Sequence, residues 1–176
     1  MTMLRDNPSR ARPCGRGFTL VELVAVVAVV AIVGVAALGS ISNMGSNRSA
    51  AAARRLAREI VYARDRATST GTSSWIVLDT AADTCRVLAD NPASPGYASA
   101  SALTDPGSGR AMQITFNAGE FAGVDLLSAS PAQLGFDWLG RPISTSGVVL
   151  TSAATISLTG GRTITVRAQT GEVRWP

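Results

Sequence analysis

The sequence contains no histidine. Histidine is the commonest general base and the commonest metal ligand, so its absence excludes the usual Ser/His and Cys/His nucleophile arrangements. No cysteine or carboxylate spacing in the chain fits a metal site either. We therefore predict no catalytic residues, no metal ligands and no cofactor, and hence a protein that is not an enzyme. Asp79, Asp83 and Asp90 could form a carboxylate site, but we interpret them as solvated turn acids.

Long apolar runs are absent from the chain except for one near the N-terminus. Residues 18–38 contain a single charged side chain, that of Glu22, and these 21 residues would span roughly 32 Å as a helix. This length matches the apolar thickness of a bilayer. Residues 1–17 carry three of the four net positive charges, all from arginine. Arginine before an apolar segment keeps that end in the cytoplasm, so we predict a single-pass membrane protein whose C-terminal domain lies on the far side, in a periplasm-like space.

Cysteine is scarce, because the chain has only Cys14 and Cys85. Cys14 precedes the apolar run and Cys85 follows it, so we expect them on opposite sides of the membrane. They cannot then pair within one chain, and packing alone must hold the C-terminal domain together.

Glu22 is the unusual residue of the apolar run. A charged side chain in a membrane helix costs roughly 2.5–3.5 kcal/mol, although less near the helix end. The sequence places no partner within reach of it on the same chain. Cleavage after Gly17 would create one, because the new amine of Phe18 lies one turn from Glu22. The same amine of a neighbouring subunit could also meet Glu22 in a bundle of helices, where a low dielectric strengthens the pair.

The stretch RGFTLVEL at residues 16–23 resembles the class III signal of the type IV pilin superfamily. This resemblance implies that a prepilin peptidase and methyltransferase cuts after Gly17 and methylates Phe18. It also implies that Glu22 guides the subunit onto other pilins or pseudopilins through the N-terminal helix. The leader of 17 residues is longer than the shortest leaders of the family, and Met3 is an alternative start.

Two other types of N-terminal signal fit these residues less well. A conventional signal peptide could end near residues 35–37, but Glu22 would then lie inside an overlong apolar core. A lipoprotein signal at Cys14 would need its apolar segment before the cysteine, whereas here the segment follows it.

The helical pattern continues beyond the apolar run. Residues 39–47 are rich in weak helix formers, so we predict a bendable point there. The charged residues between 54 and 66 are interpreted as a solvated face, and the alternative is a surface that contacts another subunit or an anion. A helix reaching residue 70 would be roughly 75 Å long, which suits a filament core better than a monomeric domain. Within this helix, apolar residues recur at a spacing of three and four and predict a buried stripe: Ala53, Leu56, Ile60, Ala63 and Ala67.

The rest of the chain has the pattern of strands and turns. Residues 74–79 and 84–89 predict a hairpin, and residues 112–116 and 133–138 alternate between apolar and polar. Segments 155–159, 163–168 and 172–175 predict an antiparallel meander whose first turn is Gly160-Gly161. We therefore predict an α+β fold, with a long N-terminal helix packed on an antiparallel β domain of two small sheets. The expected divisions are a cleaved leader (1–17), a membrane half of the helix (18–41), a periplasmic half (42–70) and a β domain (71–176) with a loop near 91–110.

The C-terminal part resembles the GspH/FimT group of that superfamily. The resemblance rests on FDWLGRP at residues 136–142, GRTITV at 161–166 and TGEV at 170–173. It implies a minor pseudopilin of a type II secretion system. The alternative is a minor pilin of a type IV pilus, which would serve pilus assembly, twitching or DNA uptake.

DNA binding is a separate question within this group. Its DNA-binding members carry a Gly-Arg-x-Arg stretch near the end, and the second arginine is missing from residues 161–164 here. The chain without its leader is also nearly neutral and has no interleaved aromatic residues for base stacking, so the sequence does not favour DNA as a partner. Clustered positive charge could still contact phosphates, and the candidate residues are Arg141, Arg162, Arg167 and Arg174.

Overall fold

The computed structural model describes residues 19–175, except for the side chains of residues 35–43. Within this range the chain forms one α-helix followed by ten short strands and two 3-10 helices. It divides into two compact units, Met1–Ser40 and Ile41–Pro176. The predicted leader, with Gly17 and Phe18, lies outside the described residues.

The first unit holds the beginning of α1 (Leu20–Thr70). Its aliphatic side chains are exposed, as Val30 illustrates with 64% of its surface accessible. Among the described residues, no helix combines the length and the hydropathy needed to cross a bilayer. A membrane-spanning role for residues 18–41 stays a prediction. The helix runs without interruption through residues 39–47, so the bendable point predicted there also stays a prediction.

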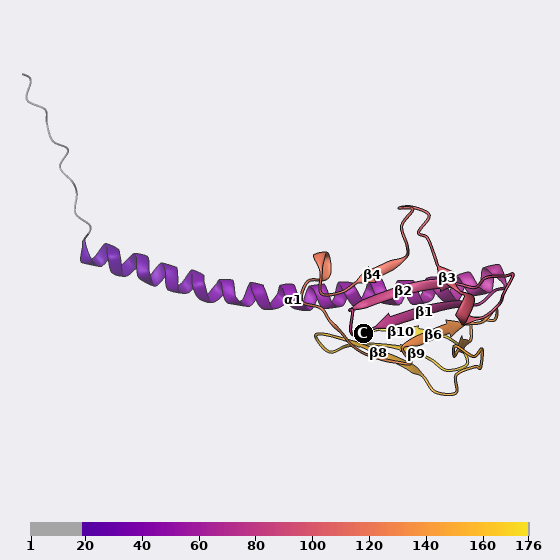
Figure 1. Ribbon diagram of the computed structural model, residues 1–176. Helices are drawn as coiled ribbons and strands as arrows, with labels where there is room; N and C mark the ends of the chain where they lie inside the picture. Colours follow the sequence, from indigo (N-terminus) through magenta and orange to yellow (C-terminus); the bar gives the residue numbers. More distant parts are fainter. Residues whose placement is uncertain (1–18, 176) are drawn as a thin grey trace, which may run out of the picture. The chain divides into compact units, whose positions relative to one another are not determined.

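In the second unit, α1 buries the predicted stripe. All five of its residues, Ala53, Leu56, Ile60, Ala63 and Ala67, are almost wholly inaccessible to solvent, which confirms the prediction. The helix ends where Gly71 takes a φ of 69°, a left-handed conformation that glycine adopts without steric cost. Figure 1 shows the strands of both sheets lying along this part of α1.

The larger sheet follows α1 directly and is antiparallel throughout. Its order is β3-β2-β1-β6-β7, and β4 pairs with β2 beside β3. Ile76 and Leu78 of β1 face the core, whereas Trp75 lies on the outer face and packs against Tyr97 in a T-shaped arrangement. The predicted hairpin is confirmed by the pairing of β1 with β2. The six strands are β1 (Ser74–Asp79), β2 (Thr84–Ala89), β3 (Ser101–Ala102), β4 (Gln113–Thr115), β6 (Gln133–Phe136) and β7 (Pro142–Ile143).

The smaller sheet contains the predicted C-terminal meander. Its order is β10-β9-β8-β5, again with antiparallel pairs. Gly160 and Gly161 take φ values of 83° and 71°, as the tight turn between β8 and β9 requires. The helix stripe and both sheets share one hydrophobic core, so the α+β prediction with two sheets is confirmed. The strands are β5 (Leu126–Ser130), β8 (Ala154–Leu158), β9 (Arg162–Val166) and β10 (Val173–Arg174).

Two segments differ from the predicted pattern. The alternation predicted for residues 133–138 ends early, because β6 stops at Phe136 and a turn follows. Trp138 is therefore 61% exposed, while Asp137 is only 8% exposed, the reverse of the prediction. Residues 91–110, predicted as a surface loop, contain the 3-10 helix η1 (Tyr97–Ser99) and β3. A second 3-10 helix, η2 (Gly119–Phe121), follows β4.

Candidate assembly site

The first turn of α1 positions Glu22. The Thr19 carbonyl accepts hydrogen bonds from the backbone N–H groups of Glu22 and Leu23, both at 3.1 Å. The Thr19 hydroxyl oxygen also accepts from the Glu22 N–H at 3.3 Å. Threonine with glutamate three residues later is the pattern of a capping box, which is visible in the sequence but was not used in the prediction. Glu22 thus belongs to the first helical turn, where the helix dipole favours an acid by about 0.3–1 kcal/mol.

The face of α1 that carries Glu22 is otherwise apolar. Glu22, Ala25, Val26, Val29 and Val30 line a groove of about 280 Å³ on this face. Their spacing of three and four residues places them in one stripe along the helix. A stripe of exposed valines with one acid at its end can receive another helix, provided that this helix brings a positive group to Glu22.

The four candidate arginines do not form one group. Arg162 lies at the start of β9, where its Nη2 donates to the Ser46 Oγ at 3.5 Å, whereas Arg167 follows the other end of that strand. Glu172 accepts from Arg174 Nε at 2.8 Å and pairs with Arg167 Nη1 at 3.1 Å. The hydrogen bond from Arg174 is the main reason that the pKa of Glu172 lies below its usual range.

Arg141 belongs to a rigid turn built on Asp137. The Asp137 Oδ1 accepts from the backbone N–H groups of Leu139 at 3.0 Å and Arg141 at 2.8 Å. Its Oδ2 meets the Arg141 guanidinium through both Nε and Nη2, each at 2.8 Å. This turn touches the one before β10, because a Cβ atom on Gly171 would clash with the carbonyl oxygen of Gly140. Arg141, Arg167 and Arg174 therefore each have an acidic partner, which reduces the positive charge that they offer to an anion.

The acids considered as a carboxylate site serve separate turns. The Asp79 Oδ1 accepts from the N–H groups of Ala81 and Ala82 within the β1–β2 turn. Asp83 Oδ1 accepts from Leu126 N at 2.8 Å, and Asp90 Oδ1 accepts from Gly96 N at 2.9 Å. Among the described residues, no group of three or more His, Cys, Asp or Glu could hold a metal ion.

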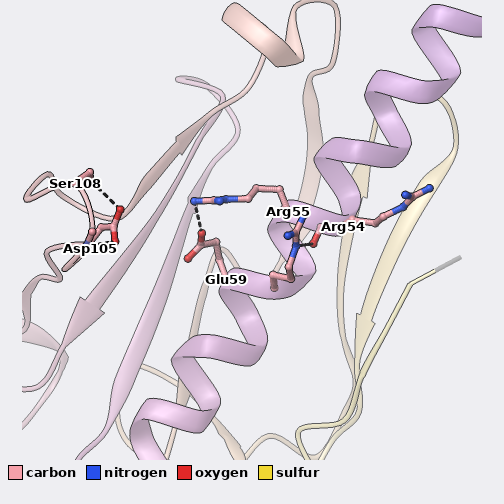
Figure 2. A network of polar contacts seen from close by, with 7 residues as sticks. Arg54, Arg55, Glu59, Asp105 and Ser108 are labelled. Atoms are coloured by element: carbon pink, nitrogen blue, oxygen red, sulfur yellow. Dashed lines mark hydrogen bonds and ion pairs between the residues drawn. The ribbon is translucent and has the colours of Figure 1, made fainter.

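A buried acid on α1 was not anticipated. Glu59, predicted as part of a solvated face, is 7% exposed, and its Oε1 lies 2.9 Å from Arg55 Nη2 (Figure 2). Among the described residues, its Oε2 has no hydrogen-bond partner. The free thiol of Cys85 is also buried, and burial together with the charge of Glu59 raises its pKa.

Asp105 lies in the loop between β3 and β4. The same view shows its hydrogen bond with the Ser108 hydroxyl, 2.8 Å long. Gly107 N–H donates to the other carboxylate oxygen at 3.0 Å, and these bonds lower the pKa of Asp105. The positive charge of Arg55 contributes a smaller decrease in the same direction.

Comparison with known proteins gives a motif and a fold. Residues 12–38 match the prokaryotic N-terminal methylation motif. None of the curated proteins matches the sequence. The solved structures below share the fold of this chain at low sequence identity.

Two of them are structures of the minor pseudopilin EpsH from the type 2 secretion system of Vibrio cholerae. One has a TM-score of 0.52 at 14% identity over 73% of this chain and 96% of its own. The other has a TM-score of 0.53 at 11% identity over 74% and 97%. The third is the type IV minor pilin FimU of Pseudomonas aeruginosa, with a TM-score of 0.52 at 18% identity over 74% and 89%.

Proposed function

From the premise that the methylation motif and the fold together support a type IV pilin-like protein of the GspH/FimT group, we propose that this chain is a minor pseudopilin of a type II secretion system. Prepilin peptidase cuts after Gly17 and methylates Phe18. The motif suggests that the N-terminal helix then anchors the subunit in the inner membrane, with the β domain in the periplasm. The processed subunit joins the periplasmic pseudopilus that serves protein secretion.

The observation that carries this proposal is the exposed apolar face of α1 with Glu22 at its start. Relative to exposure to water, burial of one valine side chain contributes about 1.5–3 kcal/mol. Once the helix leaves the membrane, the stripe must therefore be covered by other helices. The second unit does not need this stripe, because it has its own core. The stripe is therefore available for neighbouring subunits.

Glu22 gives the packing its register. In the assembled filament, the amine of Phe18 from a neighbouring subunit lies against the Glu22 carboxylate. The surroundings are apolar, and a low dielectric strengthens this ion pair. A subunit shifted along the stripe would bury the Glu22 carboxylate without a positive partner. The free-energy cost of burying this unpaired charge exceeds the gain from the shifted apolar contacts.

A minor pilin of a type IV pilus is the second candidate, and the match to FimU favours it. Such a subunit would serve pilus assembly, twitching or DNA uptake. DNA uptake is the least supported of these roles, because the acids beside Arg141, Arg167 and Arg174 offset their charge.

Deletion of the gene in its own host distinguishes the two candidates. We expect the exported enzymes to accumulate in the periplasm, and wild-type protein supplied from a plasmid to restore their secretion. Surface pili and twitching should stay at the level of the parent strain. Normal secretion with loss of pili would instead identify a minor pilin of the type IV pilus.

A further inference from the structure

Strand β4 leaves one edge of the larger sheet open. Phe116 N–H donates to the Asp83 carbonyl at 2.7 Å, and the Met112 carbonyl accepts from Val87 N–H at 3.1 Å. The even-numbered residues of this segment therefore direct their backbone groups toward β2. Because these directions alternate along an antiparallel strand, Gln113 and Thr115 direct theirs away from the sheet.

Nothing in the described part of the chain pairs with this outer edge, since β4 pairs only with β2. Natural edge strands are usually protected by lysine, by proline or by a bulge. β4 consists of Gln113, Ile114 and Thr115, and it pairs with β2 in a regular register without a bulge. An unprotected edge of this kind is suited to receive a further strand.

A cavity lies directly beside the open edge. Its volume is about 380 Å³, and it is bounded by β4, by η2 with the residue before it, and by Arg55 of α1. Ile114 and Phe121, both largely buried, contribute its apolar walls. A strand added to β4 would place alternate side chains toward this cavity, which can take one apolar side chain.

The charges around the cavity specify the occupant further. The Arg55 side chain is half exposed and meets Glu59 through a single terminal nitrogen, so its other donors remain available to a second acid. Glu120 lines the same cavity and would repel a run of acids. The chemistry fits one acidic side chain, held beside Arg55.

We propose that β4 receives an extended segment of a partner protein, which pairs with the backbone of Gln113 and Thr115 and places one acidic side chain beside Arg55. The interaction uses main-chain hydrogen bonds for affinity and the cavity for selection. This interaction does not involve the apolar stripe around Glu22, so it would add a second contact with another protein, made by the β domain.

The test uses the full chain in detergent micelles and a fluorescein-labelled peptide, acetyl-Thr-Val-Thr-Asp-Thr-Val-Thr-amide, followed by fluorescence anisotropy. We expect weak binding, at about 0.1–1 mM, that weakens as salt is added. A peptide with asparagine in place of aspartate should bind several-fold more weakly and lose this salt dependence.

A matched pair of variants examines the backbone. Thr115→Pro removes the outward N–H but leaves the bonds to β2 in place, whereas Thr115→Val keeps the N–H. We expect Thr115→Pro to weaken binding about fivefold or more and Thr115→Val to stay within about twofold. Thermal unfolding of both variants verifies that the fold is retained.

Three results would overturn the proposal. They are no binding at about 1 mM protein, equal binding by the two Thr115 variants, and equal binding of the aspartate and asparagine peptides. Sedimentation of the chain without peptide tests whether a second copy of the chain occupies the edge instead. Self-association that disappears in Thr115→Pro would assign the edge to a second copy and refute a separate partner.

Discussion

Aliphatic residues occupy both units, yet they meet opposite surroundings. In the first unit, Val26, Val29 and Val30 are exposed along one face of α1. In the second unit, Leu56 and Ile60 of the same helix are fully buried against two sheets. Residue type therefore does not decide burial here, because the second half of α1 packs on two sheets, whereas the side chains described in its first half are open to solvent. The difference separates residues that stabilise the fold from residues that we propose serve assembly.

The largest effect is expected from blocking the proposed cleavage of the leader after Gly17. Gly17→Trp should stop cleavage completely, because a bulky side chain cannot take the place of glycine at the peptidase site. Mass spectrometry of the membrane form would then show the 17-residue leader retained. Gly17→Ala is the matched control and should be largely processed; if Gly17→Trp is processed as well, the assigned cleavage site is wrong.

Glu22→Ala should leave processing intact and reduce incorporation into the filament by at least an order of magnitude. The physical reason is loss of the ion pair that we propose fixes the register of the helices. Quantification of the subunit in sheared filaments measures this, and Glu22→Asp is the conservative control. Normal incorporation of Glu22→Ala would exclude the pair as the basis of docking.

One substitution in each unit tests whether only the buried aliphatic and aromatic residues stabilise the fold. Phe136→Ala removes a fully buried ring and should lower the free energy of unfolding by about 3–5 kcal/mol. Val30→Ala removes an exposed side chain and should change it by less than about 0.5 kcal/mol, while weakening assembly. Urea unfolding followed by circular dichroism provides the numbers. Similar losses in both variants would mean that the first unit helps to hold the fold.

The smallest effect concerns the alkaline side of the stability profile. An unfolded thiol ionises near pH 8.5, whereas the raised pKa of Cys85 keeps it protonated in the folded chain. The folded state then binds more protons above about pH 8.5, so its stability decreases as pH rises, by at most about 1.4 kcal/mol per pH unit.

Cys85→Ala removes this contribution. Urea unfolding at about pH 7 and pH 10 should show a larger decrease for the wild type than for the variant, by about 1–2 kcal/mol. Parallel profiles of the two proteins would contradict the burial of an un-ionised thiol.

Local periodicity explains which parts of the fold were predicted. The stripe on α1, the β1–β2 hairpin and the turn at Gly160-Gly161 each follow from a few neighbouring residues. Strand β3 was missed because its two residues carry no periodicity. The turn at Asp137 was missed because one carboxylate there binds two backbone N–H groups and Arg141, which reverses the expected exposure of Asp137 and Trp138.

Only part of the candidate site was predicted, again because local sequence patterns reveal some residues and not others. Glu22 was identified because a lone acid in an apolar run is visible in the sequence, although its capping bond with Thr19 was not recognised. The buried position of Glu59 could not be read from a charged helix segment, since the packing of α1 on the sheets decides it. The partners of the four arginines likewise depend on which turns meet in space.

The placement of the three tryptophans has a practical consequence. Trp75 is enclosed beneath Tyr97, whereas Trp138 and Trp175 are open to solvent. Acrylamide will quench the emission of the outer pair and spare the inner indole. The molecule thus carries its own optical probes: loss of quenching reports that a neighbour covers the β domain, and a red shift of the protected emission reports that the larger sheet has come apart.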